Sequence, residues 1–257
     1  MRDSIEPALE RLDTAPAPAA MRFDDGSPFG THAFVLPSAF NPPTIAHAHL
    51  LDAATHSSPS PAPEGSRERG PGGEGSCIAL LTTKNVDKSL HGASLAHRVG
   101  MLLALRDEAP QIAVVASNQA RIVDQAESLT RSFGFEQLTF VVGFDTLERL
   151  FAPRYYTDME RELGPFFEHH RVLAANRASA TPEDVANWIA ANTTPFTQRI
   201  DVLEIDDFPA SLSSTQVRAA LTEHTDHPAL SPAVRRYILE HHLYRPKPED
   251  PQECGST

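Results

Sequence analysis

Short runs of apolar residues recur along this chain, and each is followed by a stretch with the spacing of an amphipathic helix. The runs cover residues 32–36, 77–82, 112–115, 138–142, 171–175 and 200–203, and the helical stretches between and after them include 45–54, 95–105, 122–129 and 146–151. Strands that are apolar at successive positions are buried on both faces, and crossover helices provide the cover. The pattern predicts an α/β fold: a doubly wound, Rossmann-like parallel sheet with helices on both faces. A C-terminal helical segment follows around Val234–Ile238.

The domain boundaries follow from the segments that lack such a pattern. Residues 1–30 carry Ala-Pro repeats, so we expect a short helix at most, Ile5–Leu12, and then a flexible lead-in. Residues 31–245 are predicted to form a single domain. Within it, residues 57–76 are almost entirely Ser, Pro, Gly, Glu and Arg. Such a composition buries too little apolar surface to offset the entropy of ordering, so we expect a disordered insertion there and a flexible tail at 246–257.

Charge and cysteine content exclude several classes of protein. Of the 257 residues, 22 are Lys or Arg and 34 are Asp or Glu, a net charge of −12. Sequence-independent binding to nucleic acid depends on basic contacts to phosphates, so we expect no nucleic-acid partner. The two cysteines, Cys77 and Cys254, exclude a disulfide scaffold. No apolar run approaches the roughly 18 residues of a membrane span, and the N-terminus lacks a signal-peptide core. We expect no membrane partner and a cytoplasmic location, with a nuclear one and the oligomeric state left open.

A first candidate anion site is Pro37-Ser-Ala-Phe-Asn-Pro-Pro-Thr-Ile-Ala-His47, which joins the first strand to the first helix of the sheet. Doubly wound sheets bind anions on the backbone N–H groups at this helix N-terminus. Thr44 and His47 lie three residues apart and therefore share one face of the first turn. Their hydroxyl and imidazole groups can both donate hydrogen bonds to phosphate oxygens. The alternative is an ordinary helix start, with Thr44 as the cap and His47 as its partner.

A second candidate site is Ser211-Leu-Ser-Ser-Thr-Gln-Val-Arg218. Ser213, Ser214 and Thr215 are residue types that cap helix N-termini, and their hydroxyls can hold a phosphate tail. Arg218 lies one turn further along and can grip the same anion. Alone, this segment is equally a capped helix with a solvated arginine. Together, the two segments can bracket a triphosphate.

The two segments carry a resemblance to a known family. Phe40–His47 resembles the Phe-Asp/Asn-Pro-x-His/Thr-x-Gly-His signature of the HxGH nucleotidyltransferases, and Ser213–Arg218 is similar to their Ser-rich signature ending in Arg. Val142–Thr146, Lys88–Met101 and Val234–Tyr244 resemble segments of the nicotinamide mononucleotide (NMN) adenylyltransferases within that family. The resemblance spans about residues 32–245 outside the insertion. This chain departs from the family pattern in two places. Pro37-Ser38-Ala39 stands where family members usually carry Gly-Gly/Ser-Ser/Thr, and Thr44 and Ala46 stand where the helix motif usually has His and Gly.

The resemblance implies adenylyl transfer from ATP, accompanied by Mg²⁺, to NMN or nicotinate mononucleotide by direct in-line attack. The partners would be ATP and the mononucleotide, and no residue is expected to bind a metal. The catalytic residues implied are His47, Thr44 and Arg218. The residues implied for the ATP phosphates are Ser38, Ala39, Phe40, Ser213, Ser214 and Thr215. Those implied for the second substrate are Asn85, Lys88, Gly143, Asp145 and Arg177.

Several alternatives remain open at this point. The acceptor can be another phosphomonoester, such as phosphopantetheine, choline phosphate or FMN, because the nucleotide motifs are shared across the superfamily. The missing glycines also leave a non-catalytic nucleotide-binding protein open. Asp145 fits either a ribose contact or the N-cap of a helix at 146–151. Tyr155, Tyr156 and Trp188 are the aromatic candidates for a pyridine ring, and Trp188 fits the core better.

Overall fold

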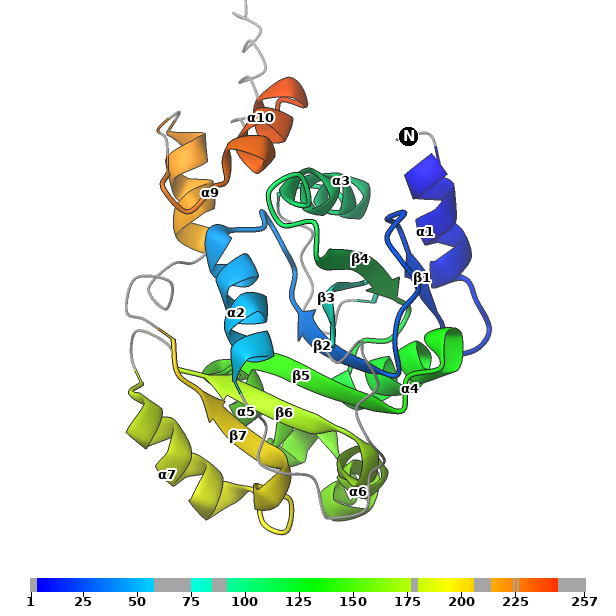
Figure 1. The fold of residues 1–257 in the computed structure, drawn as a ribbon, viewed down its shortest axis with the longest axis vertical. Coiled ribbons are helices and arrows are strands. Elements are labelled where there is room, and N and C mark those ends of the chain that lie inside the picture. Colours follow the sequence, from blue (N-terminus) through cyan, green and yellow to red (C-terminus); the bar gives the residue numbers. More distant parts are fainter. Residues whose placement is uncertain are drawn as a thin grey trace, which may run out of the picture.

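The computed structural model describes residues 4–57, 75–84, 92–176, 180–205, 214–223, 225 and 227–244. Its centre is a seven-stranded sheet in the order β1-β4-β3-β2-β5-β6-β7 (Figure 1). The strands are β1 (Ala20–Arg22), β2 (His32–Pro37), β3 (Ser76–Thr82), β4 (Ile112–Ser117), β5 (Gln137–Gly143), β6 (Arg171–Ala175) and β7 (Ile200–Leu203). All neighbouring strands are parallel except β1, which pairs antiparallel with β4. The predicted doubly wound sheet is therefore confirmed.

Helices cover both faces of the sheet because successive strand residues point to opposite sides. One face packs against α1 (Ile5–Asp13), α2 (Ile45–His56), α3 (Leu95–Leu105), α9 (Ser214–Thr222) and α10 (Pro232–Glu240). The other packs against α4 (Ile122–Phe133), α5 (Phe144–Leu150), α6 (Met159–His169) and α7 (Pro182–Asn192). Two short 3-10 turns, η2 (Pro153–Tyr155) and η3 (Thr197–Arg199), complete the described elements. We call the core between the sheet and α1, α2, α3, α9 and α10 the first core, and the core on the opposite face the second core. In β2, for example, Phe34 and Leu36 point into the first core, whereas Ala33 and Val35 point into the second.

The strand order places the crevice of the fold between β2 and β5. From β2 the chain moves to β3 and β4 on one side, and from β5 it moves to β6 and β7 on the other. A doubly wound sheet binds ligands outside the carboxyl ends of the strands at such a switch point. The residues that leave these ends are Pro37–Ala39 after β2 and Gly143–Asp145 after β5.

The N-terminal segment contains the short helix expected at Ile5–Leu12, and a strand stands where a flexible lead-in was expected. Helix α1 buries Ile5, Leu9 and Leu12 against the first core, because these residues fall on one helical face. Strand β1 extends the sheet beyond β4, and the buried Asp24 carboxylate fixes the chain that follows by accepting from the Val114 N–H at 2.7 Å. A three-residue strand is too short to show the alternation of apolar and polar residues by which a strand is recognised in a sequence.

The insertion expected at 57–76 lies mostly outside the described residues, as does the tail expected at 246–257. At the edges of the insertion, Ser57 is the C-cap of α2 and Ser76 begins β3. The two flanks therefore belong to neighbouring elements of one sheet domain.

Candidate functional site

Two cavities lie side by side at the carboxyl edge of β2. The smaller, here called the His47 cavity, has a volume of about 530 Å³, and the larger, here called the Gln125 cavity, about 630 Å³. They share Pro37, Ser38, Ala39, Thr146 and Arg149. The loop after β2 is thus the junction between two spaces, each within the usual size range of small-molecule sites.

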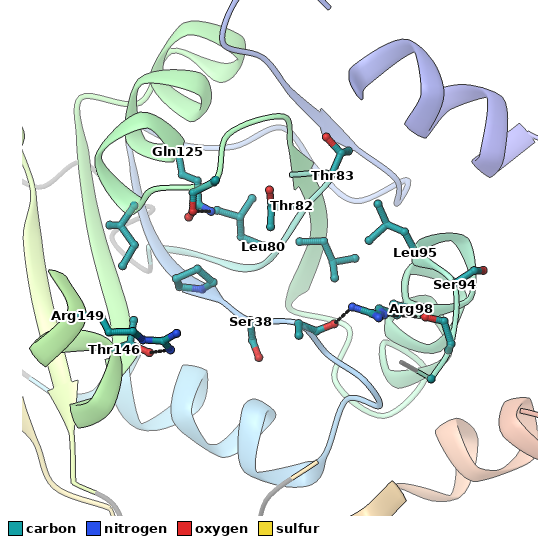
Figure 2. Close-up of a pocket in the computed structure, with 17 residues that line it drawn as sticks. Ser38, Leu80, Thr82, Thr83, Ser94, Leu95, Arg98, Gln125, Thr146 and Arg149 are labelled. Carbon is teal, nitrogen blue, oxygen red and sulfur yellow. Dashed lines mark hydrogen bonds between the residues drawn. The ribbon is translucent and has the colours of Figure 1, made fainter. Parts of the chain in front are cut away.

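The two cavities differ in their remaining walls. The His47 cavity is also lined by Leu36, Thr44, Ala46, His47, Leu50, Gly143, Asp145, Ala175, Asn176, Ile205, Ser214 and Thr215. The Gln125 cavity is also lined by Leu80–Thr83, Gly92–Leu95, Arg98, Ala120, Ile122 and Gln125 (Figure 2). Of the residues expected at the site, Thr44, His47, Ser38, Ala39, Gly143, Asp145, Ser214 and Thr215 line one or both cavities.

His47 is held by the first turn of α2. Its Nδ1 atom is 3.0 Å from the backbone nitrogen of Thr44, which donates to it, and 2.8 Å from the Thr44 hydroxyl. An Nδ1 that accepts a backbone N–H carries no proton itself, so in the neutral ring the proton sits on Nε2. Nε2 lies 3.2 Å from the Ser38 hydroxyl, beside the junction of the two cavities. Thr44 is the helix cap and His47 is its partner, and the same geometry aims an N–H donor at the junction.

Phe40 turns the loop that carries these groups. It is fully buried, its ring centroid lies 4.9 Å from that of His47, and its φ of 44° is in the left-handed region. Bulky residues seldom adopt this conformation, and such residues concentrate at ligand sites. Its side chain packs against the imidazole ring of His47, and Phe40 lines neither cavity.

The late segment of the chain meets this early loop. The Ser214 hydroxyl donates to the Pro42 carbonyl at 2.9 Å, and Arg218 donates to the Asn41 carbonyl at 2.7 Å. A second guanidinium nitrogen of Arg218 donates to the Thr215 hydroxyl at 3.1 Å. These bonds bring the N-terminus of α9 to the His47 cavity, although Arg218 itself is not among the lining residues.

Asp145 lies in the first turn of α5, whose N-cap is Gly143. The alternative of Asp145 as an N-cap is therefore wrong, because the helix begins earlier than its sequence pattern indicates. The Asp145 carboxylate is exposed and lies 3.7 Å from the Arg149 guanidinium. Both side chains line the His47 cavity, at the carboxyl end of β5.

Four expected site residues lie outside the part of the chain that the structure describes. They are Asn85, Lys88, Arg177 and Ser213. Their roles stay predictions.

No family model matches the chain. A Schizosaccharomyces pombe protein described as "Putative nicotinamide mononucleotide adenylyltransferase" is 28% identical over 162 residues, which span 61% of this chain and 58% of that relative. The resemblance to the NMN adenylyltransferases is confirmed.

Solved structures agree on the fold. The nicotinic acid mononucleotide adenylyltransferase of Plasmodium falciparum, complexed with NaAD, is 16% identical with a TM-score of 0.59. The same enzyme complexed with APC gives a TM-score of 0.56 at 16% identity. Each match covers 84% of this chain and 98% of the solved one.

Arg98 is a cavity residue of this NMN adenylyltransferase-like fold to which the sequence analysis gave no role. It is only 6% exposed, and it donates from Nε to the Ala93 carbonyl at 2.9 Å and from a terminal nitrogen to the Ala39 carbonyl at 3.4 Å. Burial lowers the pKa of its guanidinium, and the charge of nearby Arg218 acts in the same direction, whereas Tyr244 acts to raise it. Among the described residues Arg98 has no carboxylate partner within ion-pair distance.

Arg98 and Arg218 each donate to a different backbone carbonyl of the loop that follows β2. Arg98 binds the Ala39 carbonyl and Arg218 binds the Asn41 carbonyl, so the loop sits between two cations. Their combined positive potential favours an anion at the junction of the cavities, despite the overall negative charge of the chain.

Arg149, Asn176 and Gln125 are among the other lining residues to which the sequence assigned no role. Arg149 lies at the junction, Asn176 follows β6, and Gln125 lies in the first turns of α4. Asn176 donates to the Ile205 carbonyl at 3.2 Å and accepts from its N–H at 2.8 Å, which ties the strand ends of β6 and β7 together. Of these three residues, Asn176 alone could have been identified from the sequence, because it directly follows a predicted strand and therefore lies at the carboxyl edge of the sheet.

The aromatic candidates lie elsewhere. Trp188 packs in the second core, with its ring centroid 5.7 Å from that of Phe144 and 6.3 Å from that of Phe151. Neither Trp188 nor Tyr155 nor Tyr156 lines either cavity. The preference for Trp188 as a core residue agrees with this packing.

Within the described ranges, no group of three or more His, Cys, Asp or Glu side chains is arranged to hold a metal ion. None of the described helices is both long enough and apolar enough to cross a membrane.

Proposed function

We propose that this protein transfers the adenylyl group of ATP to the 5′-phosphate of a pyridine mononucleotide, NMN or nicotinate mononucleotide, and releases pyrophosphate. The observation that carries the proposal is the pair of cavities that meet at Pro37–Ala39, with His47 Nε2 beside the meeting point. Two substrates that react directly with each other must bind in adjoining spaces, and these two cavities adjoin at the loop that follows β2. The sequence similarity to the Schizosaccharomyces pombe relative supports the same reaction class.

In this proposal ATP occupies the His47 cavity. Its phosphates lie between the first turn of α2 and the N-terminus of α9. The Thr215 hydroxyl accepts from Arg218 and can still donate to a phosphate oxygen, whereas the hydroxyls of Thr44 and Ser214 shape this wall through their bonds to His47 Nδ1 and the Pro42 carbonyl. A guanidinium has five N–H donors, so the two contacts of Arg218 leave donors for a β- or γ-phosphate oxygen. The exposed carboxylate of Asp145 is placed to accept from ribose hydroxyls at the carboxyl end of β5.

The mononucleotide occupies the Gln125 cavity. Its phosphate lies at the junction, where the buried guanidinium of Arg98, which has no carboxylate partner among the described residues, stabilises it. This orientation directs a phosphate oxygen across the shared loop toward the α-phosphorus in the neighbouring cavity.

The chemistry needs positioning and charge stabilisation rather than an activated nucleophile, because the attacking phosphate is already an anion. An oxygen of the mononucleotide phosphate bonds to the α-phosphorus while the bond to the α–β bridging oxygen breaks. Negative charge develops on that bridging oxygen, and the N–H at His47 Nε2 donates to it. The electron pair leaves with pyrophosphate.

Mg²⁺ enters this proposal as the companion of ATP. Among the described residues that line the His47 cavity, Asp145 is the one acidic side chain, and a single carboxylate is too few ligands to hold Mg²⁺ by itself. Mg²⁺ is commonly held by substrate phosphates and water with few protein ligands, which fits this wall.

One observation favours a second candidate. None of the described residues that line either cavity is Phe, Tyr or Trp, so the described part of the Gln125 cavity wall offers no aromatic ring for stacking on a pyridine. An acceptor without a pyridine, such as phosphopantetheine or choline phosphate, therefore competes with NMN.

The deciding experiment is turnover with a panel of acceptors. Purified protein with ATP and Mg²⁺ is mixed with NMN, nicotinate mononucleotide, phosphopantetheine, choline phosphate or FMN, and pyrophosphate and the adenylylated product are measured. We expect dinucleotide only with the pyridine mononucleotides, and none with His47→Ala. If product forms with another acceptor instead, that acceptor is the substrate. If ATP binds but no product forms with any acceptor, the protein is not an adenylyltransferase.

A further inference from the structure

Helix α5 carries a polar face that borders both cavities. Its buried residues, Leu147 and Leu150, pack in the second core. Asp145, Thr146 and Arg149 line one or both cavities instead. Residues three and four positions apart lie on one face of a helix, so these three side chains are neighbours. The chain thus places a carboxylate, a hydroxyl and a guanidinium at the carboxyl end of β5.

Arg149 differs from the other cations near the site because it borders both spaces. Among the described residues, it is the one Arg or Lys that lines both cavities. Arg98 lines only the Gln125 cavity, and Arg218 lines neither. Arg98 is also 6% exposed and donates to the Ala93 carbonyl at 2.9 Å, which fixes it in the wall. Arg149 is therefore the cation placed to reach ligands in both cavities.

The junction of the cavities is formed by two elements. One is the loop Pro37–Ala39, where His47 Nε2 lies 3.2 Å from the Ser38 hydroxyl, and the other is α5, which contributes Arg149. Figure 2 shows Arg149 and Arg98 on opposite sides of the pocket, with Ser38 between them. A phosphate group at the junction would therefore lie within reach of both the His47 donor and the Arg149 guanidinium.

The Arg149 side chain can be reached by a ligand. It is 50% exposed, and the carboxylate side chain of Asp145 beside it is 52% exposed. The guanidinium lies 3.7 Å from that carboxylate and 3.5 Å from the Thr146 hydroxyl, and both distances exceed the roughly 3.2 Å of a good hydrogen bond. An exposed ion pair of this kind contributes little stability, so a phosphate can take the place of the carboxylate.

We propose that Arg149 donates to both reacting phosphates together, one from each cavity, and thereby allows the two substrates to bind at the same time. This inference rests on the proposed function, which puts ATP in the His47 cavity and the mononucleotide in the Gln125 cavity. The acceptor phosphate and the α-phosphate of ATP are both anions and must approach until a bond forms. Repulsion opposes that approach, and a cation beside both groups offsets it. A guanidinium suits this position because its planar fork holds five N–H donors.

Arg149 makes and breaks no covalent bond in this step. An oxygen of the mononucleotide phosphate bonds to the α-phosphorus, the bond to the α–β bridging oxygen breaks, and its electron pair leaves with pyrophosphate. The guanidinium keeps its protons and donates to non-bridging oxygens of the two phosphates. Its removal should therefore affect the joint binding of the substrates more than the binding of either one alone.

The quantity that tests this role is the coupling factor, the factor by which one substrate changes the dissociation constant of the other. In the unaltered protein, a saturating ATP analogue should change the dissociation constant of NMN by less than about threefold. In Arg149→Gln the same analogue should raise it at least about tenfold, because the two anions then meet without the shared cation.

The measurement is calorimetry on the full chain. The analogue is α,β-methylene ATP with Mg²⁺, in which a methylene replaces the α–β bridging oxygen, so no pyrophosphate can leave. NMN is titrated into the protein with and without the analogue, and the reverse titration must give the same coupling factor. A substitution that merely disturbed the wall would weaken each ligand alone and leave the factor unchanged. Equal coupling factors in the unaltered protein and in Arg149→Gln overturn the proposal.

Two further variants act as controls. Arg154→Gln removes the same charge from an exposed arginine that contacts Tyr155 and lines neither cavity, so its coupling factor should match that of the unaltered protein. Arg149→Lys keeps the charge without the fork, so its coupling factor should be smaller than that of Arg149→Gln. The proposal is overturned if either control shows the same coupling factor as Arg149→Gln.

The neighbouring carboxylate offers a competing explanation. In Arg149→Gln the Asp145 carboxylate loses the ion pair at 3.7 Å, and its charge would itself repel the phosphates. Combining Asp145→Asn with Arg149→Gln removes both charges. A coupling factor that stays at about tenfold or more in this double variant supports direct contact between Arg149 and the phosphates, and a factor below about threefold overturns it.

The outcomes separate this inference from the proposed function. Dinucleotide formation with equal coupling factors leaves the reaction standing and removes the role of Arg149. The expected difference in coupling without dinucleotide formation leaves Arg149 as the residue that holds the two phosphates together and removes the reaction. No binding of NMN, alone or with the analogue, removes the assignment of the Gln125 cavity and the role of Arg149 with it.

Discussion

The Nδ1 atom of His47 accepts a hydrogen bond from the backbone N–H of Thr44 at 3.0 Å, and this bond decides which nitrogen of the imidazole can act. The helix cap fixes Nε2 as the donor, and Nε2 lies 3.2 Å from Ser38 at the junction of the two cavities. A local device for starting a helix thus also orients the group proposed to stabilise the leaving pyrophosphate.

His47→Ala should lower kcat far more than ATP affinity. The N–H at Nε2 is proposed to act on charge that exists only in the transition state, so we expect kcat to fall about 10²- to 10³-fold. The dissociation constant for ATP should change by less than about threefold. His49→Ala is the control, because His49 is exposed on the same helix and lines neither cavity. Equal losses in kcat and ATP affinity would assign His47 to simple binding.

Arg98→Met should weaken binding of the mononucleotide through its phosphate. Removal of a buried cation next to the proposed phosphate position should raise the dissociation constant of NMN about 10- to 100-fold. Nicotinamide riboside lacks the phosphate, so its affinity should not change. The two ligands are compared by calorimetry on the same preparations, and a parallel loss for both would show that Arg98 only supports the wall.

Arg218→Ala should loosen the β2 loop and weaken ATP binding. It removes the bond to the Asn41 carbonyl, and Ser214→Ala removes the neighbouring bond to the Pro42 carbonyl. We expect each substitution to raise KM for ATP about tenfold, since a charged or well-placed hydrogen bond contributes on the order of 1–2 kcal/mol. Glu223→Gln, outside both cavities and near the end of α9, serves as the control. An unchanged KM for ATP in Arg218→Ala would show that α9 does not contribute to ATP binding through Arg218.

The parallel part of the sheet could be predicted from sequence because each of its strands, β2 to β7, is a short apolar run bounded by polar residues. Arg171–Ala175 and Ile200–Leu203 were predicted with the bounds that the structure shows. Period and composition are local properties, and strands that are buried on both faces depend on them directly.

The contacts that build the site could be predicted only in part. The two phosphate motifs were found separately, and their meeting depends on a hydrogen bond between Ser214 and Pro42 that joins positions 172 residues apart. Gln125 gave no signal at all, because a glutamine in a helical stripe is usually solvated. Its burial arises when the Gln119–Ala120 backbone folds over its amide, which no local pattern encodes.

His170 should make the protein lose stability as the pH falls. Burial, and to a smaller extent the charge of His169, lower the pKa of His170 from 6.5 to about 4. Its Nδ1 accepts from the Leu138 N–H at 3.2 Å, which requires the neutral ring. Between pH 6.5 and about 4 the unfolded chain binds a proton that the folded chain does not, so stability is full above pH 6.5 and decreases toward pH 4. The loss attributable to this group should reach about 2–3 kcal/mol near pH 4.

The measurement is urea unfolding of the full chain at several pH values between 4 and 7. His170→Gln should remove most of the pH dependence that this residue causes, at the cost of some stability at pH 7. His169→Gln is the matched control, because His169 is exposed and should change the slope only slightly. A slope that is the same in His170→Gln as in the unaltered protein would place the pH dependence in another group.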